Sequence, residues 1–210
     1  MKRHLIICSL TLSLICLLAS CTDSPQKRAA NLVETEIKKS LYIPESYNLA
    51  DIKVDSAFAP YDNPEFIDQT QELIDIGREL EEAKAEIKQA KSSISIWSYP
   101  YGGYFSNNLN EARADLKAAQ AKEEQAITRG KKIAEEMKRQ MAGPSKFIGY
   151  KAYVSYRAKN NNGNILMDKM FAIFDKDINN ISYMIDGETY EQYQETMKLI
   201  HEAKDSYSYH

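Results

Sequence analysis

The stretch FIGYKAYVSYRAKNNNGNILMDKMFAIFDKD, residues 147–177, decides the fold, because it combines strand alternation with a turn that fixes the strand register. In its first arm, apolar and aromatic side chains alternate with polar ones, which is the period of a strand with one buried face. Residues 160–164 are asparagines and one glycine, which tolerate the positive φ of a tight hairpin turn. The second arm, around Phe171 and Ile173, alternates less cleanly and is expected to be more enclosed. A β-hairpin whose first arm has one solvent-exposed face is therefore predicted.

The patterns on either side predict the rest of an α+β domain. Ser24 followed by Pro25 is typical of a helix start, and apolar residues at every fourth position continue this helix for about four turns. Alternation over residues 51–58 and 181–185 predicts a first and a fourth strand. A capping-box pattern at Thr189 predicts a final helix. The predicted fold class is α+β, with a helix packed on a small antiparallel sheet of about four strands.

Residues 64–143 have a different pattern, in which apolar side chains recur every seven residues. Glu123 and Gly130 interrupt the second half of this repeat, and Gly143 with Pro144 ends it. The first half is net acidic and the second net basic, so antiparallel pairing would place opposite charges side by side; two separately solvated helix faces are the alternative. We predict a long antiparallel helical hairpin, a coiled coil, inserted between strands 1 and 2. Its first seam consists of Phe66, Leu73, Ile76, Leu80, Ala83, Ile87, Ala90 and Ile94.

The loop that joins the two predicted helices is rich in aromatic side chains, although hairpin loops are normally short and polar. Aromatic side chains with a polar edge recur in contacts with proteins and glycans. The alternative is that these side chains form a small core that holds the two helix ends together. The candidate residues for binding a protein or glycan partner are Trp97, Tyr99, Tyr101, Tyr104 and Phe105.

The first residues, MKRHLIICSLTLSLICLLASC, combine a basic start, an apolar run and small residues before a cysteine. This pattern is typical of a secretory signal, here residues 1–20, that is removed from the mature protein. The segment LASC also resembles the lipobox of bacterial lipoproteins, which predicts acylation of Cys21 and attachment to a membrane through a lipid anchor such as palmitate. A plain signal peptide is the alternative. Thr22 favours the outer membrane by analogy with known sorting rules, at the periplasmic face or the cell surface.

Charge and residue types exclude several classes of function. The net charge of −3 becomes about −5 without Lys2 and Arg3, which argues against a nucleic-acid partner. Outside the signal segment the histidines are His201 and His210 and the cysteine is Cys21, so no pair of nucleophile and base is predicted. The loop after Asp175 resembles the start of a calcium loop but lacks its sixth-position glycine. No enzyme, metal or cofactor is therefore predicted.

The segments SLYIPESYNLADIKVDSAF, YKAYVSYRAKNNNGN and FAIFDKD, which begin at residues 40, 150 and 171, carry a resemblance to a known group of proteins. Their order resembles small lipoproteins of unknown function from Gram-negative bacteria of the Bacteroides type. In those proteins a helix leads to one strand, and a hairpin with a similar turn follows. The resemblance implies a cystatin-like or NTF2-like α+β unit and implies no activity.

The predicted organisation has four parts. Residues 1–20 are a signal peptide, 21–63 a tether with the first helix and strand, 64–143 the inserted hairpin, and 144–210 the remaining strands and last helix. The predicted function is that of a lipid-anchored envelope protein acting as a binding or scaffolding module. The alternative is an envelope enzyme or enzyme inhibitor that uses the sheet face. A buried titratable pair in a pocket would favour the alternative, and a sheet face filled by a helix would favour the first.

Overall fold

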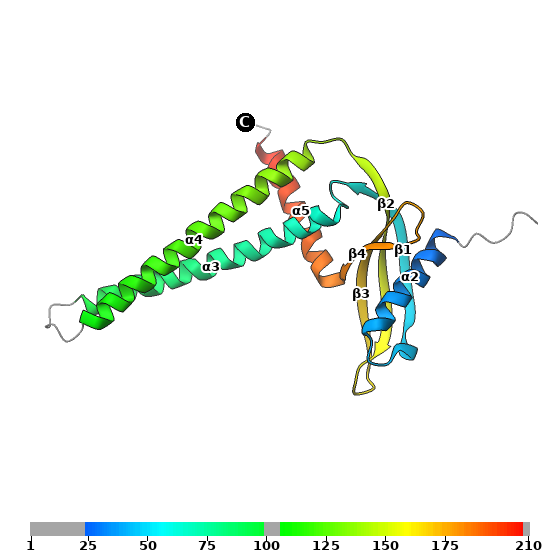
Figure 1. Ribbon diagram of the computed structural model, residues 1–210, viewed down its shortest axis with the longest axis horizontal. Helices are drawn as coiled ribbons and strands as arrows, with labels where there is room; N and C mark the ends of the chain where they lie inside the picture. The colour runs from blue at the N-terminus through cyan, green and yellow to red at the C-terminus, as the bar shows by residue number, and fades with distance from the viewer. Residues whose placement is uncertain (1–23, 99–105, 208–210) are drawn as a thin grey trace, which may run out of the picture.

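The computed structural model describes residues 24–98 and 106–207, and it describes side chains as far as residue 200. These residues form an α+β fold with one four-stranded antiparallel sheet of order β1-β2-β3-β4 (Figure 1). The predicted α+β class, the four-stranded antiparallel sheet and the insertion of the helical hairpin between β1 and β2 are thus confirmed. The elements are α2 (Pro25–Ser40), the 3₁₀ turn η1 (Pro44–Ser46), β1 (Asn48–Ala59), α3 (Pro64–Trp97), α4 (Ser106–Met141), β2 (Lys146–Lys159), β3 (Ile165–Phe174), β4 (Ile181–Asp186) and α5 (Gly187–Tyr207).

Helix α2 fills one face of the sheet, which we call the α2 face. The helix begins as predicted, because the Ser24 hydroxyl accepts a hydrogen bond from the Lys27 N–H at 3.2 Å and Pro25 follows. The apolar side chains at every fourth position of α2 are buried against side chains of β2 and β3, the two central strands. The core of the α2 face includes Ala29, Val33, Ile37, Ala152, Val154, Tyr156, Ala172 and Phe174.

Strands β2 and β3 form the hairpin that the sequence predicts. Gly163 adopts φ +80°, a conformation that L side chains rarely adopt. The side-chain oxygen of Asn160 accepts hydrogen bonds from the N–H groups of Asn162 and Asn164, at 3.0 and 2.9 Å. These bonds close the turn and fix the register, in which Ala152 lies opposite Ala172. Residues 171–174 are buried on both faces, so the prediction of a more enclosed second arm is confirmed for that end of β3.

The opposite face of the sheet is not solvent-exposed throughout, which corrects the expectation of one exposed face and one covering helix. Helix α5 covers β3 and β4 on this face (Figure 1), and the bases of α3 and α4 complete a second core that also buries Ala57 of β1. The ring of Tyr190 stacks on Phe171 with 3.6 Å between centroids. Alternation within one strand cannot show that a distant helix supplies this cover. The second core consists of Ala57, Phe66, Ile67, Met137, Phe171, Ile173, Tyr190, Tyr193 and Met197.

Helices α3 and α4 pack side by side along their length and form the arm of the molecule (Figure 1). An ion pair between Glu86 and Lys122, at 2.8 Å, and another between Glu79 and Arg129 join the two helices. This is the antiparallel pairing of opposite charges that the sequence predicts. Gly130 does not interrupt the packing, since a Cβ there would lie 3.4 Å from the Ile76 side chain. Along most of the length of the arm, the buried positions of the seam are small: Ala83, Ala90, Ala112, Ala119 and Ala126.

Helix α5 begins three residues earlier than the capping-box pattern at Thr189 predicts. The cap is Asp186, whose carboxylate accepts hydrogen bonds from the Thr189 N–H at 2.8 Å and from the Thr189 hydroxyl at 2.7 Å. Gly187 then passes close to β3, where a Cβ would lie 2.5 Å from the Cβ of Lys169. A side chain at this position would push the helix away from the sheet. The strand β4 therefore runs directly into α5.

Candidate functional site

Of the predicted partner-binding group only Trp97 falls in the described residues, and it lies at the far end of the arm. Trp97 is the last residue of α3 and is half-buried, and its neighbour Ile96 is 62% exposed. The other predicted residues, Tyr99, Tyr101, Tyr104 and Phe105, lie outside the described residues. The predicted lipidation site Cys21 and the signal segment also lie outside them. Their roles therefore stay predictions.

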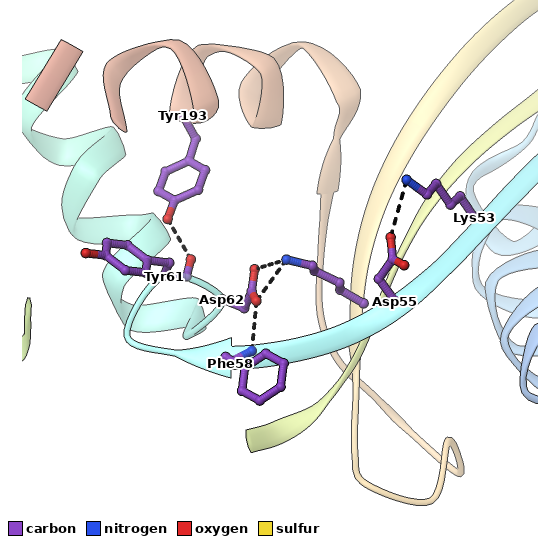
Figure 2. Close-up of polar contacts among 7 residues, drawn as sticks. Lys53, Asp55, Phe58, Tyr61, Asp62 and Tyr193 are labelled. Carbon is purple, nitrogen blue, oxygen red and sulfur yellow. Dashed lines mark hydrogen bonds and ion pairs between the residues drawn. The ribbon is translucent and has the colours of Figure 1, made fainter. Parts of the chain in front are cut away.

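The base of the arm, in contrast, is built into the domain. Phe66, Ile67 and Met137 are buried in the second core. Figure 2 shows the junction of β1 and α3, where Asp62 accepts a hydrogen bond from the Phe58 N–H at 2.8 Å. The hydroxyl of Tyr193, on α5, donates to the Tyr61 carbonyl at 2.6 Å. The arm is thus fixed at its base by strand, helix and core contacts together.

A cleft of about 490 Å³ lies on the second face of the sheet, beside α5. It exists because α5 covers β3 and β4 and leaves part of β1 and β2 open. The cleft is both charged and aromatic, a composition that suits a polar ligand. The side chains that matter for its chemistry are Lys53, Asp55, Lys151, Tyr153, Tyr190 and Glu191.

The lysines of the cleft are held by acidic partners. Lys151 donates to both carboxylate oxygens of the buried Asp62, at 2.7 and 2.9 Å (Figure 2). Asp62 is also held by the Phe58 N–H, so the pair locks the end of β1 to β2. Lys53 and Asp55 lie 3.6 Å apart on β1, and both are exposed. This pair of a buried carboxylate and a half-buried ammonium adjoins the cleft, but its geometry is that of a structural lock.

Glu191 is the second acidic centre of the cleft. It accepts hydrogen bonds from the Tyr153 hydroxyl at 2.8 Å and from the Lys169 ammonium at 2.9 Å. The bond from Lys169, with that from Tyr153, lowers the pKa of Glu191. Burial, followed by the bond to Glu191, raises the pKa of Tyr153. At neutral pH Glu191 is therefore ionised and Tyr153 is protonated. The cleft then presents a fixed negative charge and hydrogen-bond donors, and neither side chain is free to act as a general base.

The loop after Asp175, which resembles the start of a calcium loop, lies within the described residues. They contain no group of three or more His, Cys, Asp or Glu side chains that could hold a metal ion. The loop after Asp175 is closed by its own hydrogen bonds, because the Asp175 carboxylate accepts from the N–H groups of Asn179, at 2.8 Å, and of Asp177, at 3.2 Å. The first of these bonds is the main reason that the pKa of Asp175 is lowered. The resemblance to a calcium loop is explained by this turn.

A third surface lies at the end of the sheet farthest from the arm. Here Ile165 and Met167, near the tip of the β2–β3 hairpin, are 66% and 60% exposed. A pocket of about 370 Å³ lies between this hairpin and the end of α2, with Leu166 and Tyr42 in its wall. Sequence reasoning missed this surface and the cleft, because both gather residues from segments that are distant in sequence.

Comparison with known proteins found no matching family model, no matching curated protein and no matching solved structure. Among the described residues, no helix has the length and apolar character needed to cross a membrane.

Proposed function

We propose that this protein is a lipid-anchored binding or scaffolding module of the cell envelope, which holds a protein or glycan partner at the end of the α3–α4 arm. The observation that carries the proposal is the way the arm is built. At 1.5 Å per residue, the 34 residues of α3 make an arm of roughly 50 Å. Its base is buried in the second core, through Phe66, Ile67 and Met137. Because the base of the arm is fixed in the domain, a partner bound at the other end would be held at a set distance from the domain.

The seam of the arm supports a role in contact and not in chemistry. Buried alanines along the seam let the two helices approach closely, and the ion pairs Glu79–Arg129 and Glu86–Lys122 fix their register. The arm has little interior of its own, and its helices carry many charged, exposed side chains. The aromatic group predicted at its end is the exception to this composition. A long polar arm with an aromatic end is suited to reaching a partner.

The position of α2 supports the proposed anchor. Cys21 precedes the helix cap Ser24 by three residues, which span at most about 10 Å when extended. An acyl chain on Cys21 would thus hold the start of α2 close to a bilayer. Helix α2 lies on one side of the sheet and the arm extends from the other (Figure 1). In the proposed arrangement the arm would therefore point away from the membrane that carries the anchor.

Capture of a partner from the native envelope tests this proposal. One variant lacks residues 80–128, so that a short Gly-Ser loop joins the helices just beyond the Glu79–Arg129 pair. A second, matched variant keeps the full arm and carries Ile127→Ser, a change on the exposed side of α4. The shortened chain should remain folded and membrane-bound but should lose the partner, whereas the Ile127→Ser chain should keep it. Equal capture by the shortened chain would refute the proposed role of the arm.

The cleft supports a second candidate function, an envelope enzyme or enzyme inhibitor that uses the sheet face. The supporting observation is an open, charged and aromatic cleft beside α5. Glu191→Gln with Tyr153→Phe would remove its acidic centre and its hydroxyl while keeping the shapes of both side chains. Under the leading proposal, partner capture is unchanged in this variant. Loss of capture with a full-length arm would favour the sheet-face function.

A further inference from the structure

In the sheet formed by the described residues, β1 is an edge strand. It has 12 residues, whereas the other edge strand, β4, has 6. A long edge strand presents backbone N–H and C=O groups that can pair with another strand. Most of β1 is also exposed on both sides of the sheet, including Leu49 and Phe58. The outer side of β1 is therefore a candidate interaction surface.

Two irregularities define the part of β1 that is suited to pairing. The register between β1 and β2 shifts between Leu49 and Asp51, and again between Ala57 and Phe58. Between these shifts, residues 51–57 form an uninterrupted ladder with β2. The middle residue of this regular segment is Val54. A second copy of the segment can therefore lie antiparallel to the first about a two-fold axis at Val54, with both regular segments fully paired.

The charges on the second face of the sheet select this same register. In it, Lys53 lies opposite Asp55 of the second copy, and the symmetry repeats the pair. Shifting the axis to Lys53 would place Lys53 opposite itself and Asp51 opposite Asp55. Shifting it to Asp55 would place Asp55 opposite itself. Like charges directly opposite each other are destabilising, so only the axis at Val54 gives complementary charges among these three registers.

The exposure of the β1 side chains agrees with pairing to a second copy of the strand. The Lys53 and Asp55 side chains are 76% and 56% exposed, and they lie 3.6 Å apart within one chain. On the α2 face, Ile52 and Val54 are only partly buried at the edge of the core. Pairing about Val54 would place the two Val54 side chains against each other and would continue that core across the junction.

We propose that a second copy of this chain pairs with β1 in this way, so that the two sheets become one continuous sheet. The two copies run in opposite directions along the junction, so their arms leave the dimer at opposite ends of it. Each dimer then carries two arms and two clefts. Two arms on one particle raise the apparent affinity for a partner that presents two sites.

The first experiment uses oxidative cross-linking of the full chain in detergent, with Val54→Cys as the variant. Opposite residues in an antiparallel pair are close enough for a disulfide, so this variant should form a covalent dimer. The matched variant Asp51→Cys carries a cysteine that lies opposite Ala57 and should cross-link far less. The wild-type chain controls for Cys21. Equal cross-linking at both positions, or none at Val54→Cys, would overturn the proposed register.

The second experiment uses charge and analytical ultracentrifugation. Lys53→Asp alone and Asp55→Lys alone each place like charges opposite each other twice, so each should weaken self-association by about tenfold or more. A mixture of the two variants should associate again, because every acid at these positions then faces a base in the other copy. In the mixture, neither variant regains the Lys53–Asp55 ion pair within its own chain. If this pair acted only within one chain, mixing the variants would therefore restore no association. A monomeric wild-type chain at high concentration, or a mixture that stays monomeric, would overturn the proposal.

Discussion

The base of the arm should be indispensable for folding, whereas the rest of the arm should not. The perturbation is a pair of excisions. The complete excision replaces residues 64–143 with a short Gly-Ser linker and removes Phe66, Ile67 and Met137 from the second core. The partial excision removes only residues 80–128 and keeps these three side chains in place. The sequence pattern alone suggests that both variants should fold, since it marks residues 64–143 as one insertion.

The magnitude follows from burial. Phe66, Ile67 and Met137 are almost fully buried, at 0%, 1% and 2% exposure. Truncating a buried Phe costs about 3 to 5 kcal/mol, and truncating a buried Ile or Met costs about 2 to 5 kcal/mol. Their joint loss therefore costs about 7 to 15 kcal/mol, which matches the total stability of about 5 to 15 kcal/mol that a domain has. The alanines removed by the partial excision pack along the seam between α3 and α4.

The assay is thermal unfolding followed by circular dichroism. The partial excision should keep a cooperative transition, and the complete excision should lose it. Phe66→Ala is a milder change and should lower the free energy of unfolding by about 3 to 5 kcal/mol, while Ile96→Ala, at an exposed site, should change it by less than about 0.5 kcal/mol. A cooperative transition in the complete excision, at a melting temperature near that of the wild type, would refute the argument that the base belongs to the core.

Three further outcomes are expected. Cys21→Ser should move the protein from the membrane pellet to the soluble envelope fraction; retention in the pellet after a carbonate wash would place the anchor elsewhere. Trp97→Ala with Tyr101→Ala should weaken partner capture at an unchanged melting temperature, whereas a stability loss of roughly 3 kcal/mol for each change, with capture intact, would identify them as a core between the helix ends. Asp186→Ala should cost about 1 kcal/mol as a lost helix cap. The Thr189 N–H lowers the pKa of Asp186 below 3.8, so this contribution is complete above that pH and is lost as the pH falls through the lowered value. The stabilities of wild type and Asp186→Ala in urea should therefore converge in acid, and a constant difference down to pH 2 would contradict the assignment.

The elements could be predicted from the sequence because each has a local cause. Ser24 with Pro25 starts α2, and Gly163 in an asparagine-rich turn closes the β2–β3 hairpin. Alternation marks the strands, and the seven-residue repeat marks α3 and α4. These signals depend on neighbours within a few residues, so they can be recognised without knowledge of the fold. The opposite charges of α3 and α4 also predicted which two helices pair.

A candidate site could likewise be predicted only where its residues are neighbours in the sequence. The aromatic group that includes Trp97 is contiguous in sequence, so composition alone could mark it. The cleft could not be predicted, because Lys151 and its partner Asp62 are 89 residues apart and Tyr153 meets Glu191 across 38. Each of these side chains, taken by itself, looks like an ordinary solvated residue.

The sequence by itself therefore determined the type and order of the elements, the hairpin register and the insertion of the arm, because periodicity and turn chemistry act locally. Only the tertiary structure decided how the second face of the sheet is used. Helix α5 covers β3 and β4 there and leaves part of β1 and β2 open, and the close approach at Gly187 sets its position. The apolar stripe of a helix requires burial but does not specify its partner, since the hydrophobic effect is non-directional. Shape and close packing over the whole molecule make that choice.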